Sequence, residues 1–184
     1  MRRSAFFAAL LAVCCAAVLS GCGYTTKSLL PEHIKTVYVE NFKNEIDLTE
    51  EISRRRAYKL YKPALEVDIT NAVIDRFIFD GSLKISRDPE DADAILSGSI
   101  IEYVKEPLRY DDSNEDVIEF RVRVVISAKL MDIKAREPVW QVSNFAGEST
   151  YRTSGSLLKT EDTAKNEAVE DLARRLVEKT IEVW

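Results

Sequence analysis

The clearest pattern in the chain is an alternation of apolar and polar residues between positions 118 and 130. Every even-numbered position in this stretch is apolar, and the odd-numbered positions are polar or charged except Val125; the apolar set is Ile118, Phe120, Val122, Val124, Ile126, Ala128 and Leu130. Side chains two residues apart on a strand share a face. The pattern therefore predicts a long antiparallel strand with one buried face and one polar face.

Other segments also have the composition of strands, being rich in β-branched and aromatic residues. These segments are 34–42, 94–104 and 139–151. A polar loop at 107–116 and a turn at 134–136 would join the last two to the central strand. Gly98 and Gly147 lie inside predicted strands, and we expect a bulge or a close approach of another backbone at each.

Two segments have helical periodicity instead. Between Pro63, which suits the first turn, and Gly81, which suits the position just beyond the end, one stripe recurs every fourth residue: Leu65, Ile69, Val73 and Phe77. A second helix is predicted after Thr160, which can cap it. Its apolar stripe would comprise Ala164, Ala168, Leu172, Leu176 and Thr180.

The predicted element order is β-α-β-β-β-α. This order indicates an α+β fold, a two-layer sandwich with a mainly antiparallel four-stranded sheet and two helices on one face. The polar segment 43–62 is interpreted as a long loop or a marginal helix. Residues 34–184 are enough for one core but short for two, so we expect them to form a single domain.

The first 21 residues are typical of a removable export signal. A basic start precedes an apolar run over 6–19, which is too short to span a bilayer while keeping water-facing flanks. The run ends in Leu-Ser-Gly-Cys22, which resembles the bacterial lipobox, where the cysteine receives a lipid and becomes the first residue. We therefore expect a lipoprotein signal peptide over 1–21, lipidation of Cys22 and a lipidated tether over 22–33. Ordinary cleavage, with Cys22 an unmodified thiol, is the alternative.

Cysteine content and charge narrow the class further. Cys14 and Cys15 would leave with the signal, so the exported chain has no disulfide to form. The formal net charge is −5 for the whole chain and −7 once Arg2 and Arg3 are removed. Because no general basic field exists, nucleic acid is not an expected partner.

Catalytic and metal-binding chemistry is hard to find in this sequence. The only histidine is His33, beside Pro31 in the predicted tether, which disfavours histidine-assisted nucleophiles and zinc sites. The acidic run 111–116 lacks the glycine and the glutamate spacing of a calcium loop. We therefore predict no metal, no cofactor and no enzyme. A periplasmic hydrolase that uses two carboxylates is the enzymatic alternative.

Basic residues at the end of the predicted sheet are candidates for binding anions. In an antiparallel meander, the loop 107–116 and the segment that leaves the last strand lie at the same end. Arg109, Arg152 and Lys159 would then lie near one another beside a helix N-terminus, where they can accept phosphate groups. Scattered solubilising charge is the alternative.

A second basic group lies on the polar face of the central strand. Arg121, Arg123 and Lys129 occupy odd-numbered positions, so their side chains point the same way. Most such rows are simply solvated. If a partner surrounded the domain, this row would contact it, and we regard it as a candidate partner face.

Several motifs, in their order, resemble those of the LptE family of lipopolysaccharide-assembly lipoproteins across nearly all of 22–184. The matching segments are 21–24, 34–39, 92–98, 121–125, Trp140 and 167–173. The resemblance implies an outer-membrane lipoprotein that sits as a plug inside the LptD β-barrel, supports its assembly and binds lipopolysaccharide. It also implies that Arg109 and Lys159 bind lipopolysaccharide. A lipoprotein subunit of another envelope or secretion complex is the alternative function.

Overall fold

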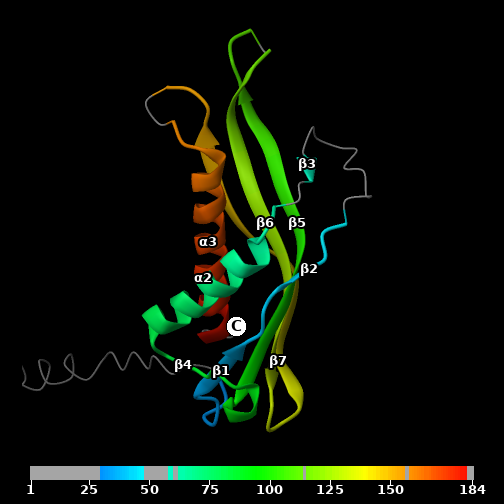
Figure 1. Ribbon diagram of the computed structural model, residues 1–184, viewed down its shortest axis with the longest axis vertical. Helices are drawn as coiled ribbons and strands as arrows, with labels where there is room; N and C mark the ends of the chain where they lie inside the picture. Colours follow the sequence, from blue (N-terminus) through cyan, green and yellow to red (C-terminus); the bar gives the residue numbers. More distant parts are fainter. Residues whose placement is uncertain (1–29, 48–57, 60–61, 114, 156–157, 182–184) are drawn as a thin grey trace, which may run out of the picture.

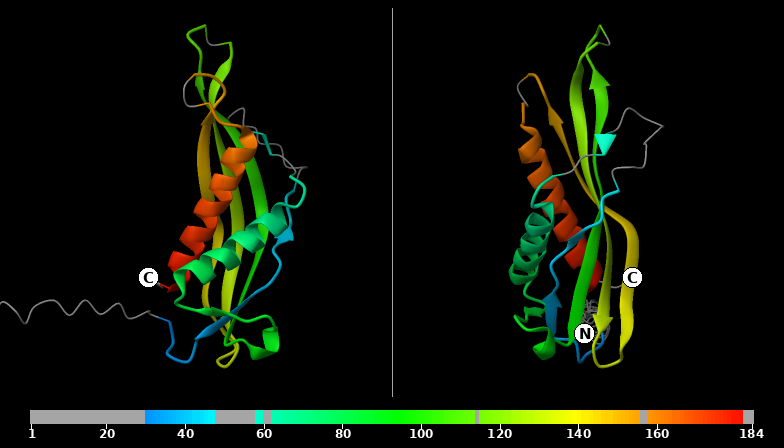
Figure 2. Two further views of the ribbon diagram at one scale, coloured as in Figure 1. Left: turned by 60° about the vertical axis from the view of Figure 1, so that its left-hand side comes forward. Right: turned by 45° about the vertical axis from the view of Figure 1, so that its right-hand side comes forward.

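The computed structural model describes residues 30–47, 58–59, 62–113, 115–155 and 158–181. In this part of the chain, strands form one sheet and two helices cover one of its faces (Figures 1 and 2). The predicted signal peptide and Cys22 lie outside the described residues. The two-layer α+β fold predicted from the sequence is confirmed.

Three long strands form an antiparallel meander that runs the length of the molecule. They are β5 (Ala94–Tyr110), β6 (Val117–Asp132) and β7 (Glu137–Arg152). Val124 in the middle of β6 pairs with Tyr103 of β5 and Gly147 of β7. Val122, Val124, Ile126 and Leu130 are fully buried, which confirms the alternation seen in the sequence.

Beyond β5, towards the opposite edge from β7, the sheet continues with short strands, some of which are parallel. β1 (Thr36–Val39) pairs in parallel with β5 and with β4 (Lys84–Ile85). Between β1 and β4 the chain passes through α2 (Leu65–Asp80), which provides the crossover that parallel strands need. β2 (Lys43–Asn44) pairs in parallel with β5, and β3 (Tyr58–Lys59) pairs with it in antiparallel fashion. The sheet is therefore mixed, with three short strands beyond those predicted.

Both helices lie close to their predicted positions. α2 ends at Gly81, which has φ 75° and donates its backbone N–H to Phe77 O at 3.0 Å. It begins at Leu65, two residues after Pro63, so the proline lies just before the helix and not in its first turn as predicted. α3 (Glu161–Ile181) is capped as predicted, with Thr163 N donating to Thr160 Oγ1 at 3.1 Å. The predicted stripes of both helices are buried.

Two glycines allow layers to approach closely. A Cβ on Gly147 would lie 2.5 Å from Leu172 N and would collide with Ala168 O, so α3 packs directly on the backbone of β7. A Cβ on Gly98 would collide with the Phe42 ring and lie 2.9 Å from Ser127 O. The close approach predicted at both positions is confirmed.

Two sequence interpretations need correction. Within 43–62, the described residues form β2 and β3, so the helical alternative is wrong there; 48–57 and 60–61 lie outside the described residues. The predicted loop at 107–116 begins only after Tyr110. β5 continues because its residues keep pairing with β6, and Pro107 lies beside a register shift, where proline is tolerated. A short 3₁₀ turn (Pro89–Asp91) precedes β5.

The described chain is already folded before residue 34, within the segment predicted as tether. Leu30 is buried, Ile34 N donates to Pro31 O at 2.9 Å, and His33 Nε2 lies 2.7 Å from Asp132 Oδ2. The histidine therefore has a structural contact at the β6–β7 turn. None of the helices in the described part is long and apolar enough to cross a membrane.

Candidate functional site

A row of charged side chains crosses the three long strands at the end of the sheet that carries the β5–β6 loop. Glu119 of β6 pairs across the strands with Arg109 of β5 and Arg152 of β7. Its Oε2 atom lies 3.5 Å from Arg109 Nε and 3.7 Å from Arg152 Nε. The two arginine side chains are 58% and 40% exposed, whereas Glu119 is only 17% exposed. One carboxylate thus holds two accessible guanidinium groups.

Lys159 lies beside this row but directs its ammonium elsewhere. Its backbone N–H donates to Arg152 O at 3.1 Å, while Nζ lies 2.8 and 2.9 Å from the two carboxylate oxygens of Glu167 on α3. Ser149 also donates to Glu167, at 2.6 Å. The hydrogen bonds from Lys159 and Ser149 hold the pKa of Glu167 below its usual range, so this carboxylate is ionised at neutral pH.

The three cations therefore lie at one end of the sheet but on different faces. Ser149 pairs with Val122, whose side chain is buried beneath the helices, so the Lys159–Glu167 pair is on the helix side. Glu119 has the opposite parity to Val122, which puts its two arginines on the other face. Three cations and two carboxylates give this group a formal charge of +1.

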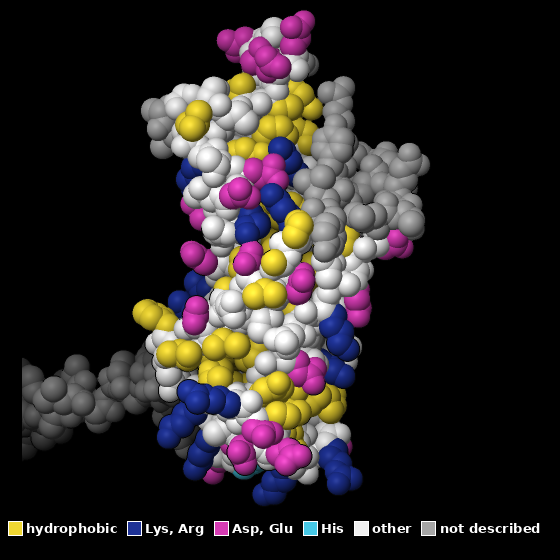
Figure 3. Space-filling model, in the orientation of Figure 1, with side chains coloured by type: hydrophobic (Ala, Val, Ile, Leu, Met, Phe, Trp, Pro, Cys, Tyr) yellow, Lys and Arg dark blue, Asp and Glu magenta, His cyan; other side chains and the backbone are white. Residues whose placement is uncertain are grey.

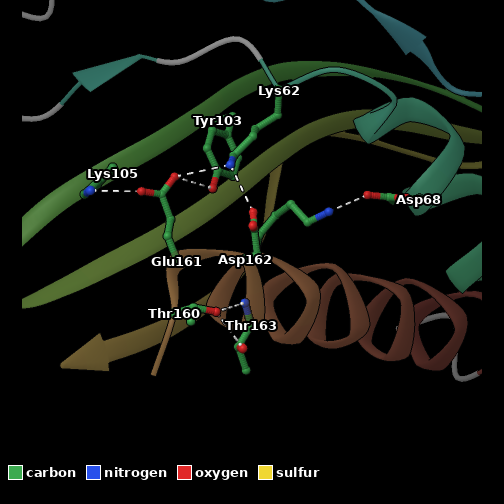
Figure 4. A network of polar contacts seen from close by, with 9 residues as sticks. Lys62, Asp68, Tyr103, Lys105, Thr160, Glu161, Asp162 and Thr163 are labelled. Atoms are coloured by element: carbon green, nitrogen blue, oxygen red, sulfur yellow. Dashed lines mark hydrogen bonds and ion pairs between the residues drawn. The ribbon is translucent and has the colours of Figure 1, made fainter. Parts of the chain in front are cut away.

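A polar network joins the start of α3 to β5 on the helix side (Figure 4). Glu161 lies 2.9 Å from Lys105 Nζ and 3.5 Å from both Lys62 Nζ and the Tyr103 hydroxyl. Burial favours the neutral form of Glu161, but the hydrogen bonds and charges of Lys105 and Lys62 outweigh it and hold its pKa below the usual range. Sequence reasoning missed this network, because Lys62, Lys105 and Glu161 are far apart in the sequence and share no local pattern.

Lys105 also lies over two aromatic rings at the same end. Its ammonium is 4.4 Å from the Phe120 ring centroid and 5.6 Å from that of Tyr151. The two rings stack with centroids 5.4 Å apart and planes inclined by 20°. Phe120 and Tyr151 occupy apolar positions of their strands, so the sequence alone did not distinguish them from ordinary core residues. The structure therefore brings an aromatic pair and a cation together on the helix side, the face opposite to Glu119 and its two arginines.

The predicted partner face lies opposite the helices. Lys129 is exposed, and Arg121 Nε lies 3.9 Å from Glu148 Oε2. A shallow pocket of about 260 Å³ opens beside Lys129, with a mainly polar lining that includes Glu40, Lys43, Ser97, Ser127 and Gln141. Val125 is buried on this face, so the face is not uniformly solvated. The arrangement offers hydrogen-bonding groups rather than an apolar surface.

The carboxylate-hydrolase alternative has little support in the described part of the chain. Hydrogen bonds to the ionised form hold the pKa values of four carboxyl groups there below the usual range, whereas a general acid needs a raised pKa; these groups are Asp93, Asp132, Glu161 and Glu167. The described part of the chain also contains no cluster of three or more histidine, cysteine or acidic side chains that could hold a metal ion.

Comparison with known families identifies the chain. The family model for LptE, described as lipopolysaccharide-assembly, matches residues 34–180. The chain belongs to the LptE family. The match covers the whole described sheet and nearly all of α3, including the charged row and the polar network at its end. Members of the LptE family act in lipopolysaccharide assembly. No curated protein sequence matches it.

Solved structures resemble this LptE-family chain at low sequence identity. Protein XCC0632 from Xanthomonas campestris is 13% identical, with a TM-score of 0.51 over 80% of this chain and 84% of that chain, and shows the same fold. Rare lipoprotein B from Shewanella oneidensis is 11% identical, with a TM-score of 0.42 over 81% and 92%. The PelC dodecamer from Paraburkholderia phytofirmans is 15% identical, with a TM-score of 0.43 over 84% and 92%.

Proposed function

We propose that this protein is an outer-membrane lipoprotein, acylated at Cys22, that plugs and supports assembly of the LptD β-barrel and binds lipopolysaccharide on its way to the outer leaflet. Membership of the LptE family is the observation that carries the proposal. The domain would then lie at the periplasmic side and within the barrel lumen. No catalytic step is assigned to it.

We assign lipopolysaccharide binding to the cations at the end of the sheet. Arg109 and Arg152 share one carboxylate at distances longer than an ordinary hydrogen bond, so their remaining N–H groups are available to phosphate oxygens. The Lys159 ammonium must leave the Glu167 carboxylate before it can bind a phosphate group. Because the net charge of this group is only +1, binding depends on displacing the internal carboxylates rather than on a strong basic field.

The partner assignment is tested by recovering the tagged full-length protein from outer membranes and identifying what accompanies it. We expect an LptD barrel in stoichiometric amount, and an acyl mass on the peptide that begins at Cys22. The Cys22→Ala variant should remain a precursor or be released from the membrane, because it lacks the lipid chains that together hold the protein stably in the bilayer. Recovery of a different barrel or ring would favour the other envelope complex.

The binding assignment is tested by reversing charges. Arg109→Glu combined with Lys159→Glu should weaken lipopolysaccharide binding by more than about tenfold, because two attractions become repulsions. Binding by the unmodified protein should also weaken with added salt, as the Debye length falls from about 10 Å at 0.1 M to about 3 Å at 1 M. Reversal of Lys35 and Lys134, which lie at the other end of the molecule, is the control. Equal affinity of both double variants for lipopolysaccharide would refute the assignment.

A gain of binding provides a sharper test of the same site. Glu119→Gln and Glu167→Gln remove the internal competitors while keeping side-chain size. If phosphate must displace these carboxylates, each variant should bind lipopolysaccharide more tightly, by a few-fold for each released charge pair. Weaker binding would instead mean that the carboxylates hold the cations in the binding geometry.

The partner face is tested by site-specific photo-crosslinking. A crosslinker placed at Arg121, Arg123 or Lys129 should capture the barrel, because we assign this face to the barrel wall. A crosslinker at Glu170 on α3 is the matched control on the helix side. Capture from the helix side alone would reverse the assignment of faces.

A further inference from the structure

The outer end of α2 exposes two large apolar side chains that the fold does not use. Ile78 is 64% exposed and Phe79 is 80% exposed, the highest value among the large apolar residues described as exposed. Figure 3 shows hydrophobic side chains gathered at this end of α2, with Lys and Arg side chains nearby. Adjacent exposed apolar residues at one end of a molecule are typical of an interaction surface.

This end of α2 lies next to the place where the chain enters the fold. Gly81 ends the helix, and Lys84 follows after a short turn, pairing with Thr36 and donating its backbone N–H to Lys35 O at 3.0 Å. β1, β4 and the end of α2 are therefore at one end of the molecule (Figure 1). The described chain starts there with the buried residue Leu30.

The length of chain upstream of Leu30 sets how far the predicted lipid can be. Seven residues lie between Cys22 and Leu30, so eight residue steps join them. At about 3.3–3.6 Å per residue they span at most about 29 Å. The bilayer that holds an N-terminal lipid is consequently within a short distance of the end of the molecule that exposes Ile78 and Phe79.

We infer that Ile78 and Phe79 contact the membrane leaflet that holds the N-terminal lipid, and that they form a second attachment point of the domain. This inference rests on the proposed acylation of Cys22. Aromatic and aliphatic side chains at the bilayer interface add to the attachment given by acyl chains. Two separate attachments also fix which end of the domain faces the leaflet, whereas a lipid on a tether alone leaves the domain free to rotate.

The charges at this end indicate apolar rather than electrostatic contact. Exposed side chains of both signs lie here, namely Lys35, Lys84 and Arg87 against Asp80, Asp88 and Glu90. The Arg76 guanidinium lies 5.2 Å from the Phe79 ring centroid, an arrangement that suits an interface where the ring is buried and the cation stays near the headgroups. We therefore expect the contact to depend little on salt.

The inference is tested with single nitroxide labels on the full-length acylated protein. Because Cys14 and Cys15 leave with the signal and Cys22 carries the lipid, Phe79→Cys gives one free thiol. In phosphatidylethanolamine and phosphatidylglycerol vesicles, the label at 79 should be several-fold less accessible to a water-soluble nickel complex than it is in the soluble domain. That soluble domain is released into detergent-free buffer by protease cleavage of the tether. Its accessibility to oxygen should rise. Ile78→Cys is the second position.

Val67→Cys is the matched control, because Val67 is 52% exposed in the first turn of the same helix. Its label should keep the same accessibility in both states. A label at 79 that stays as accessible as the label at 67, with the N-terminal acyl mass present, overturns the membrane contact alone. Absence of the acyl mass overturns both this inference and the proposed anchor. Protection that requires added barrel would assign the patch to the protein partner and refute the lipid contact.

Discussion

The two faces of β6 show how one strand serves both folding and recognition. On the helix side, Val122, Val124 and Ile126 have no exposed surface and pack beneath α3. On the other side, Arg121 makes one long ion pair, with Glu148, and Lys129 makes none within the described residues. Substitutions on the first face should therefore change stability, and those on the second should change association. The following predictions test that division, from the largest expected effect on stability to the smallest.

The largest effect is expected for Val124→Asp. This change puts an unpaired carboxylate into the core, at a cost of about 3–5 kcal/mol, which is a large part of a domain's stability. Arg123→Asp, one residue away on the opposite face, should cost less than about 1 kcal/mol. Urea unfolding of both variants measures the difference. If both variants shift the midpoint equally, the faces are not distinct.

A smaller effect is expected where α3 touches β7. Gly147→Ala adds a methyl group against the backbone of Leu172 and Ala168, so the helix must move, at a cost of about 1–3 kcal/mol. Ala146→Ser, the next residue on the opposite face, is the control and should change the free energy of unfolding by less than about 0.5 kcal/mol. Thermal unfolding compares them. An unchanged Gly147→Ala variant would show that the layers are loosely packed.

The network at the start of α3 allows a matched pair of substitutions. Glu161 and Asp162 both lie in the first turn and both contact Lys62, but only Glu161 contacts Lys105. Asp162 is 78% exposed and Glu161 is 27% exposed. Glu161→Gln should cost about 1–2 kcal/mol, because it leaves Lys105 without its anion, whereas Asp162→Asn should cost less than about 0.5 kcal/mol. Urea titration at neutral pH gives both values.

The contribution of Glu161 to the free energy of unfolding should depend on pH in a definite direction. The pKa of Glu161 is lower in the folded protein than its ordinary value, so its stabilisation is present above the unfolded pKa of about 4.3 and is lost as the pH falls through the folded value. The difference in stability between wild type and Glu161→Gln should therefore shrink below about pH 4. A difference that stays constant down to pH 3 would mean that the carboxylate is not the source.

The smallest effect on stability is expected for Lys129→Glu. The side chain is exposed and belongs to the open face, so the free energy of unfolding should change by less than about 0.5 kcal/mol. Recovery of the barrel with the tagged protein should nevertheless decrease. A loss of stability without a loss of barrel would contradict the assignment of this face to a partner.

Local pattern was enough to predict the parts of the fold whose signals are local. The alternation in β6, the stripe of α3 with its Thr160 cap, and the Gly81 stop of α2 each depend on residues close in sequence, and each is confirmed. β2, β3 and β4 were not predicted, since strands of two residues carry no periodicity and exist only through pairing with distant partners. The parallel pairing of β1 with β5 likewise depends on how the crossover through α2 closes.

The candidate site was predicted in outline and missed in detail. Antiparallel topology was enough to place Arg109, Arg152 and Lys159 at one end, but not to place Glu119 between the two arginines or Glu167 on the lysine. Those contacts depend on register, which changes near Pro107 because of the irregular pairing there. A one-residue change of register reverses which face a side chain occupies.

The long β5–β6 hairpin has a consequence for the timing of local motion. Near its loop, Leu108 and Arg109 are exposed and Ile118 to Phe120 are only half-buried, whereas Val124 to Ile126 are buried. Hydrogen exchange should therefore form a gradient along a single strand, fast near residue 118 and slow near residue 126. A strand with such a gradient can let its outer end adapt to a partner while the inner end keeps its register.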